Sequence, residues 1–420
     1  MSELRPPWMA EHVVQSLLAT LAADGIEARF VGGCVRDALL GLETGDIDLA
    51  TPVRPDAVIA ALAAAHIKAV PTGLAHGTVT AVIPPRTFEI TTLRRDVETD
   101  GRHAVVAFDA GWDEDAARRD FTINAIYLTP EGQLYDPVGG CADLAAGRVR
   151  FVGDATTRIA EDVLRILRYY RFEARFGSRD GDPAARAACR AAVGKLPTLS
   201  AERVSRELMR LIGGPTPIRA VTMMRDDGVL AAVLPEATRI DRLGQLLALT
   251  APAPGALPPP LAREGRGGGL PDPILRLAAL IDPDKAGAVA LAKRLRLSSA
   301  EQRRLAGLMP PAALDPAGDH KAQRLALYRF GAVRYRDLAL LLAADGQITP
   351  ARLHELLALA ASWPIPKFPL AGEDVTDLGI SQGPEVGRLL AAVKHWWEDG
   401  DFTADRAACL ARLKELATQS

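Results

Sequence analysis

Between residues 30 and 37 the chain reads Phe30-Val31-Gly32-Gly33-Cys34-Val35-Arg36-Asp37, which is an apolar stretch, two glycines and the start of a helical pattern. Glycines let backbone amides approach an anion closely, and a helix N-terminus adds unpaired N–H groups with a partial positive charge. Arg36 belongs to the first turn of this helix, and its guanidinium can fork onto a phosphate. The stretch therefore predicts a strand, a phosphate-binding turn at Gly32 and Gly33, and a helix. A Gly-Gly turn that merely connects two elements is the alternative.

A pair of aspartates follows in Asp46-Ile47-Asp48, which we expect on a strand, where alternate side chains share one face. Two such carboxylates repel each other unless cations lie between them, and their oxygens are ligands that suit Mg²⁺. We therefore expect Asp46 and Asp48 to hold Mg²⁺. A third carboxylate would complete a two-metal site, and Glu89 in the β-branched stretch 87–92 is the candidate. An edge-strand glutamate that faces water is the alternative for Glu89.

Strand-like and helix-like sequence patterns occur in different parts of the chain. The first part contains short stretches rich in β-branched or aromatic residues, and these expected strands are 28–31, 47–50, 78–83, 87–92 and 123–128. From Thr157 onward, apolar residues recur at intervals of three and four, which predicts helices. The sequence thus predicts an α+β fold, with a small mixed sheet and helices followed by an all-α remainder.

Prolines and glycines indicate the boundaries between the expected domains. Residues 251–272 contain runs of both, which cannot continue a helix and are typical of a linker or loop. We expect a catalytic head at 1–150, a helical neck at 151–250, and a helical body and tail at 273–420. A weaker break is Trp363-Pro364-Ile365-Pro366.

Composition excludes some classes of protein. The chain is 48% apolar and 24% charged, without the uncharged apolar run of about twenty residues that spans a bilayer. Its N-terminus lacks the signal-peptide pattern, and its four cysteines are too far apart for a zinc or redox motif, so we expect a cytoplasmic protein. Residues 1–157 have a net charge of −9, residues 158–210 of +5 and residues 293–336 of +7. The two basic blocks predict contacts with RNA phosphates, although solvated helix faces have the same composition.

The motif Gly32-Gly33-x-Val35-Arg36-Asp37, followed by Asp46-x-Asp48, resembles the head of the polymerase-β-type nucleotidyltransferases. The resemblance is to the family of class II CCA-adding tRNA nucleotidyltransferases and bacterial poly(A) polymerases. It extends to Arg118-Arg119-Asp120-Phe121-Thr122-Ile123-Asn124-Ala125, which is similar to the family's ribose-contacting motif. The resemblance implies nucleotide-binding roles for Arg119, Asp120 and Asn124, and a polymerase-β-like head followed by an all-α neck, body and tail.

The stretch Glu161-Asp162-Val163-Leu164-Arg165-Ile166-Leu167-Arg168 resembles the family's nucleotide-selecting motif, in which an Asp and an Arg pair with the incoming base. On a helix, residues at i and i+3 are neighbours, so Asp162 would offer acceptors and Arg165 donors to one base. A simple salt bridge between the two is the alternative. Arg168 and Arg171 continue this face, and we expect them to reach the triphosphate.

Two further stretches resemble the same family. Asp100-Gly101-Arg102-His103 is similar to the flexible loop that CCA-adding members use to switch from C to A. Residues 200–208 are similar to the last neck motif, which begins at a helix N-cap and implies support for the selecting helix.

The resemblance implies addition of C, C and A to the 3′ end of tRNA, without a template, from CTP and ATP and with release of pyrophosphate. The expected partners are tRNA, ATP and CTP, and neither a membrane nor a protein partner is implied. Bacterial poly(A) polymerases share the head motifs, but residues 70–80 resemble the CCA-adding version and lack the Gly-Arg-Arg-Phe style of element. An enzyme that adds only CC or only A and an inactive tRNA-binding protein are further candidates.

Overall fold

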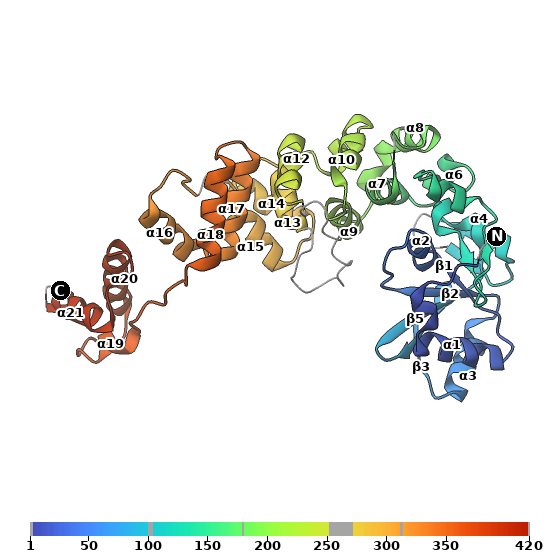
Figure 1. The fold of residues 1–420 in the computed structure, drawn as a ribbon, viewed down its shortest axis with the longest axis horizontal. Helices are drawn as coiled ribbons and strands as arrows, with labels where there is room; N and C mark the ends of the chain where they lie inside the picture. Colours follow the sequence, from blue (N-terminus) through green and yellow to red (C-terminus); the bar gives the residue numbers. More distant parts are fainter. Residues whose placement is uncertain (1–2, 100–103, 179, 252–271, 311–313, 419–420) are drawn as a thin grey trace. The chain divides into compact units, whose positions relative to one another are not determined.

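The computed structural model of this chain describes residues 3–99, 104–178, 180–251, 272–310 and 314–418 (Figure 1). The chain forms two compact units. The first runs to Ile240 and includes the described residues 272–277 and 294–296, and the second holds the other described residues after Ile240. Apart from its two end residues, the predicted linker 251–272 lies outside the described ranges, so the predicted domain limits stay predictions.

The first unit begins with a mixed sheet of seven strands in the order β3-β4-β5-β2-β1-β8-β9. Strands β2 and β5 run parallel, and all other neighbours in the sheet are antiparallel. The strands are β1 (Arg29–Val31), β2 (Ile47–Thr51), β3 (Lys68–Gly73), β4 (Thr78–Ile83), β5 (Arg86–Thr92), β8 (Tyr127–Leu128) and β9 (Leu134–Tyr135). A separate pair, β6 (Arg95–Thr99) and β7 (Ala104–Ala107), forms a two-stranded sheet. The predicted mixed sheet is confirmed.

Helices cover and connect these strands. They are η1 (Pro7–Ala10), α1 (His12–Ala23), α2 (Gly33–Leu39), α3 (Pro55–Ala64), η2 (Leu74–His76), α4 (Trp112–Arg118), η3 (Thr122–Asn124) and α5 (Gly140–Ala145). The expected strands at 28–31, 47–50, 78–83 and 87–92 are confirmed as β1, β2, β4 and β5. The strand expected at 123–128 is wrong over most of its length. The amide of Ala125 donates to the carbonyl of Thr122 at 3.0 Å, which closes the short helix η3 and leaves only β8 as strand.

Each face of the sheet has its own apolar core, because successive side chains of a strand point to opposite faces. One core is formed with α1 and α3 and takes these strand residues: Phe30, Ile47, Leu49, Phe88 and Ile90. The other takes Val31 and Ala50, which pack with Ala116 of α4. By the same alternation, Asp48 and Glu89 point to the face of the second core.

From Ala155 the described chain is helical, as predicted. The first unit continues with α6 (Ala155–Glu161), α7 (Arg165–Phe176), α8 (Pro183–Ala191), η4 (Val193–Thr198), α9 (Ala201–Ile212), α10 (Pro217–Asp226) and α11 (Val229–Val233). Helix α7 packs against both α9 and α10. Ser200 stands at the N-cap of α9, which confirms the predicted start of the last neck motif.

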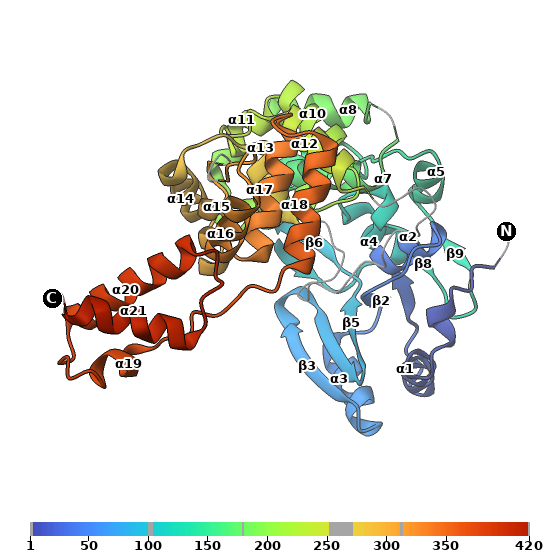
Figure 2. The same cartoon turned by 60° about the vertical axis from the view of Figure 1, so that its left-hand side comes forward.

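Helices α12 (Ile240–Leu249), α13 (Pro273–Leu280) and α14 (Lys285–Arg294) have residues in both units. The second unit continues with α15 (Ser299–Gly307), α16 (His320–Phe330), α17 (Ala332–Ala344), α18 (Pro350–Ser362), α19 (Gly372–Thr376), α20 (Pro384–Asp399) and α21 (Arg406–Thr418). Figure 2 shows α19, α20 and α21 together, around a core that includes Val375, Trp397 and Leu413. The break predicted at 363–366 lies between α18 and α19. No helix in the described ranges is long and apolar enough to cross a membrane.

Candidate active site

The Gly32-Gly33 turn joins β1 to α2, as the sequence predicts. Gly32 has a φ of +74°, in the left-handed region that glycine adopts at low cost. A Cβ atom at Gly32 would lie 3.8 Å from the carbonyl oxygen of Asn124 and 3.9 Å from Nη1 of Arg119. The turn therefore lies against the 118–125 motif, and phosphate binding there stays a prediction.

Arg36 is buried and already bonded. Its Nε and Nη2 donate to Oδ1 of Asp37 at 2.9 and 2.8 Å, and its Nη1 donates to Oδ1 of Asn124 at 2.5 Å. Its guanidinium also lies 4.2 Å from the ring centre of Phe176 in α7. Burial lowers the pKa of Arg36, and Asp37 partly offsets this effect. Arg36 thus connects α2 with η3 and α7, and its expected contact with phosphate stays a prediction.

The expected acidic residues lie on or directly before two neighbouring central strands of the sheet, β2 and β5. Asp48 of β2 pairs in register with Glu89 of β5, so both side chains point to the same face. Asp46 is exposed and directly precedes β2, so its predicted place within the strand is wrong. Burial and the negative charges of Glu89 and Asp46 raise the pKa of Asp48 to about 6, while Arg119 acts in the opposite direction. These carboxylates and Arg119 are therefore near enough to influence one another.

A metal site formed by Asp46 and Asp48 agrees better with the structure than a site of three carboxylates that includes Glu89. Within the part of the chain that the structure describes, no three His, Cys, Asp or Glu side chains form a group that could hold a metal ion. Asp46 and Asp48 remain as a pair of hard oxygen ligands. The role of Glu89 as a third ligand stays a prediction.

An open pocket of about 320 Å³ has Arg119 in its lining, the same arginine that acts on the charge of Asp48. Its lining residues are Arg118, Arg119, Asp120, Asp162, Leu164, Arg165, Arg168 and Arg203. The pocket brings together the 118–125 and 161–168 motifs, which the sequence predicts to act on one nucleotide. Arg171 is not among the lining residues, because its Nε pairs with Oε2 of Glu207 in α9 at 2.6 Å.

Asp120 connects the head to α7 within this pocket. Its Oδ1 accepts from Nδ2 of Asn124 at 3.1 Å, and its Oδ2 accepts from Nε of Arg168 at 2.8 Å. Burial would raise the pKa of Asp120, but Arg168 and Asn124 outweigh burial and lower it to about 2. Asp120 is therefore ionised at neutral pH and holds Arg168 in place.

The predicted helical pair of Asp162 and Arg165 is wrong in its geometry. Asp162 has extended backbone (φ −151°) and ends α6, whereas α7 begins at Arg165. The physical reason is local: Oδ1 of Asp162 accepts from the amide of Leu164 at 3.1 Å, a bond that competes with a continuous helix. The alternative salt bridge between Asp162 and Arg165 does not form either, because Arg165 pairs with Glu161.

Arg203 of α9 is a pocket residue that sequence reasoning treated only as part of a supporting motif. Its Nη2 donates to Oδ2 of Asp162 at 2.7 Å. This bond agrees with the support predicted for residues 200–208. The signal available in the sequence was an arginine in the first turn of a helix with a large apolar face, which is too common to single out one residue.

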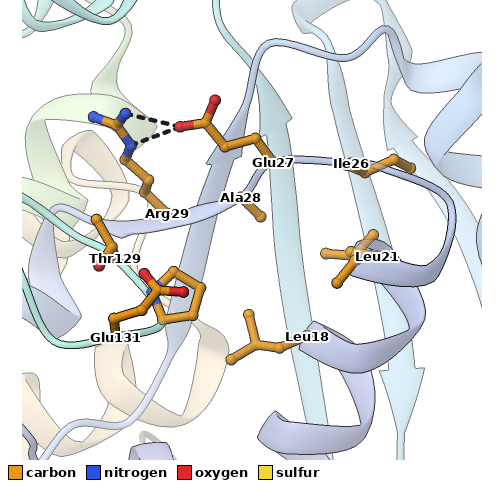
Figure 3. Close-up of a pocket in the computed structure, with 10 residues that line it drawn as sticks. Leu18, Leu21, Ile26, Glu27, Ala28, Arg29, Thr129 and Glu131 are labelled. Carbon is orange, nitrogen blue, oxygen red and sulfur yellow. Dashed lines mark hydrogen bonds and ion pairs between the residues drawn. The ribbon is translucent and has the colours of Figure 1, made fainter.

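A second pocket lies apart from this site, and one set of predicted residues, at 100–103, is not described by the structure. Asp100, Gly101, Arg102 and His103 lie outside the described residues. The second pocket, of about 220 Å³, is near the end of α1, and Leu18, Leu21 and Ile26 are among its lining residues. Figure 3 shows two further lining residues, Glu27 and Arg29, whose side chains are hydrogen-bonded to each other. None of the candidate site residues lines this second pocket.

Two protein-family models match this chain, one over the head and one over the helices that follow it. Residues 28–150 match the family described as "Poly A polymerase head domain", and residues 182–240 match "Probable RNA and SrmB- binding site of polymerase A". The chain is 33% identical to the mitochondrial CCA tRNA nucleotidyltransferase 1 of Mus musculus over 415 residues, which cover 96% of this chain and 90% of the mouse protein. It is 38% identical to the CCA-adding enzyme of a Geobacillus species over 215 residues, which cover 51% of this chain and 52% of that enzyme.

Solved structures agree with these sequence matches. The Bacillus stearothermophilus CCA-adding enzyme in complex with CTP superposes with a TM-score of 0.77 at 28% identity, covering 99% of each chain. The Thermotoga maritima CCA-adding enzyme complexed with tRNA has the same fold, with a TM-score of 0.62 at 20% identity. The motifs, their convergence on one pocket and a likeness that spans nearly the whole length agree: this chain belongs to the family of CCA tRNA nucleotidyltransferases.

Proposed function

We propose that this chain adds C, C and A to the 3′ end of tRNA without a template, from CTP and ATP and with release of pyrophosphate. The observation that supports this most strongly is the position of Arg119. Its guanidinium lies beside the Gly32 turn, acts on the charge of Asp48 and lines the pocket that contains Asp162. One side chain therefore links the carboxylates to the nucleotide pocket, where a triphosphate would have to lie for nucleotidyl transfer.

Asp46 and Asp48 are the residues that would hold Mg²⁺. Protein sites for this ion commonly use one or two carboxylates together with substrate phosphates, which fits a pair better than a closed cage. Burial first, and then the negative charges of Glu89 and Asp46, raise the pKa of Asp48, and a bound cation would oppose both effects. Bound there, Mg²⁺ would lower the pKa of the RNA 3′-hydroxyl and offset the charge of the triphosphate. Glu89, beside Asp48, is the candidate third carboxylate.

The side chains around the pocket bind and orient the nucleotide. Arg119 and Arg168 offer donors to the triphosphate, and Asp120 together with Asn124 offers polar contacts to the ribose. With the substrates held in line, the 3′-hydroxyl oxygen forms its bond to the α-phosphorus as the bond to pyrophosphate breaks. The protein forms no covalent intermediate in this reaction.

Base selection falls to Asp162 and Arg165. They stand on either side of the break between α6 and α7 and line one pocket, where Asp162 offers acceptors and Arg165 offers donors. The bond from Arg203 leaves Asp162 able to accept further hydrogen bonds, because a carboxylate has about four lone-pair positions. The protein, rather than a nucleic-acid template, would thus choose between C and A.

The location and the domain roles belong to the same proposal. We expect a catalytic head at 1–150, nucleotide selection in the neck at 151–250, and tRNA binding in the neck and in the body and tail at 273–420. We also expect a cytoplasmic location, whereas the mouse and human relatives are named as mitochondrial proteins. Fractionation of the source cells with antibodies to the chain would decide between the two.

The test is the product ladder from a tRNA that lacks its CCA end. With CTP and ATP together we expect products three nucleotides longer, with CTP alone two nucleotides longer, and with ATP alone no extension. Long adenylate tails would indicate a poly(A) polymerase, and ladders that stop at two nucleotides or start only from tRNA ending in CC would indicate a partial enzyme. Intact tRNA ending in CCA is the control substrate and should remain unextended.

A further inference from the structure

Asp115 of α4 is a buried acid that none of the motifs above includes. Its side chain is 1% exposed, and it does not line the nucleotide pocket. It pairs with two consecutive residues that do line the pocket, Arg118 and Arg119. Its effect on a nucleotide would therefore pass through these two side chains.

The carboxylate of Asp115 divides its two oxygens between the arginines. Oδ1 accepts from Nε of Arg118 at 2.8 Å. Oδ2 accepts from Nη2 and Nε of Arg119 at 2.9 and 3.1 Å, and from the hydroxyl of Tyr127 at 2.7 Å. The same tyrosine oxygen accepts from Nε of Arg119 at 3.1 Å, so this guanidinium is held on two sides.

This arrangement fixes the direction in which Arg119 presents its remaining donors. Nη1 is the nitrogen that faces the Gly32 turn, and among the described residues it is bonded only loosely, to the carbonyl of Asn124 at 3.4 Å. An unrestrained arginine would lose side-chain entropy on binding a phosphate, and a guanidinium held beforehand avoids much of that loss. Burial opposes ionisation of Asp115, but Arg119 and Arg118 lower its pKa overall, so the carboxylate keeps its charge at neutral pH.

We propose that Asp115 is a positioning residue that orients Arg118 and Arg119 for the triphosphate of either nucleotide. The proposal rests on the proposed function only in taking a nucleoside triphosphate as the ligand of the pocket. Because the triphosphate is common to CTP and ATP, Asp115 should act equally on both and leave the choice of base unchanged. This separates its role from that of Asp162.

The chain offers a closely matched control in Asp227. Its side chain is also 1% exposed and accepts from two arginines, Arg186 and Arg190, and from the hydroxyl of Tyr170. Neither of these arginines lines the nucleotide pocket. Asp115→Asn and Asp227→Asn therefore remove the same kind of buried anion, once behind the pocket and once away from it.

The test is equilibrium binding of CTP and of ATP to the full chain without tRNA, with the melting temperature measured on each preparation. Asp115→Asn should weaken binding of both nucleotides about tenfold, as expected when a charge-assisted contact loses its orientation, while Asp227→Asn should lower the melting temperature without changing nucleotide affinity. In Arg118→Gln/Arg119→Gln, the further change Asp115→Asn should add little, because its effect passes through those two arginines. Tyr127→Phe is the milder second variant should Asp115→Asn not fold, and it should weaken both nucleotides in the same direction to a smaller extent.

Unchanged nucleotide affinity in a folded Asp115→Asn variant, or equal losses in the Asp115 and Asp227 variants, would overturn the inference. If Asp115→Asn does not fold, wild-type affinity in Tyr127→Phe overturns it as well. A wild-type chain that binds both nucleotides but extends no tRNA would contradict the proposed function and leave this inference standing.

Discussion

Asp48 is a candidate metal ligand whose ionised side chain lowers the stability of the folded protein. Its folded pKa of about 6 lies above the usual value of about 3.9, because of burial and of the charges on Glu89 and Asp46. A raised carboxyl pKa stabilises the folded state below the unfolded value, and this contribution is lost as the pH rises through about 6. Asp48→Asn should therefore raise the free energy of unfolding at pH 7.5 by about 1–2 kcal/mol in the presence of a chelator, and by almost nothing at pH 4.

Urea unfolding between pH 4 and pH 8 measures this difference. Asp56→Asn is the control, because Asp56 is exposed on α3 and its replacement should change stability by less than about 0.5 kcal/mol at any pH. A stability gain in Asp48→Asn that is the same at all pH values, or a loss at pH 7.5, would contradict this explanation of the Asp48 charge.

Some of the residue positions in the site could be predicted from the sequence, and others could not. The Gly32 turn follows from local pattern alone, whereas the shared face of Asp48 and Glu89 depends on the register in which β2 pairs with β5. Asp115 was missed, although an acid three and four residues before Arg118 and Arg119 is a readable helical pairing. What the sequence does not give is its burial and its bond to Tyr127, since these depend on strand β8 being placed beside α4.

Among the elements, the break between α6 and α7 places Asp162 at the pocket, where we propose that it reads the base. Asp162 closes this break through its bond to the Leu164 amide and faces the pocket at the same time. With tRNA ending in CC, Asp162→Ala should lower the preference for ATP over CTP by roughly tenfold or more, and should slow transfer of the correct nucleotide less, because acceptors to the base are lost while the metal ligands remain. The measurement is kcat/KM for each nucleotide on that tRNA.

Asp154→Ala, at the opposite end of α6, provides the control. Asp154 caps α6, where its Oδ1 accepts from the amide of Thr157 at 2.8 Å, but it does not line the pocket. Its replacement should cost about 1 kcal/mol of stability and leave nucleotide choice intact. Equal loss of selectivity in both variants would assign the effect to helix disturbance and remove Asp162 from its role as reader.

Elements with a strong period were predictable, and elements set by distant partners were not. The helices after Ala155 and four strands follow from apolar spacing. Strand β3 contains Pro71 and Gly73, both unfavourable within a strand, and it forms because it pairs with β4 at the edge of the sheet. The break at Asp162 was missed because the helical pattern of apolar residues continues through the turn, and that pattern does not indicate the bond between the Asp162 side chain and the Leu164 amide.

At the scale of the whole molecule, charge counted along the sequence differs from charge available to RNA. The block 158–210 has a net charge of +5, yet several of its arginines pair with acids elsewhere in the first unit. Arg175 pairs with Asp37, which lies 138 residues away, and Arg190 pairs with Asp227. The block therefore stabilises the joining of head and neck as well as offering charge to phosphates, for which the exposed Arg206 of α9 is a candidate.

Ion pairs between residues far apart in the sequence, such as Arg175 and Asp37, could not be predicted from the sequence. The order of a head followed by helices follows from composition and from the resemblance of the motifs. The division into two units does not, because α12, α13 and α14 each have residues in both, and no change of composition marks such a division.

The Mg²⁺ pair proposed here, Asp46 and Asp48, would hold the divalent cations of nucleotidyl transfer. The decisive measurement is incorporation of CMP and AMP into tRNA lacking its CCA end by the Asp46→Ala/Asp48→Ala variant, with tRNA affinity measured on the same preparation. We expect incorporation reduced by at least about a thousandfold, because several kcal/mol of transition-state stabilisation are lost, with tRNA affinity unchanged within about twofold. Incorporation near the wild-type rate by the folded variant would contradict the claim.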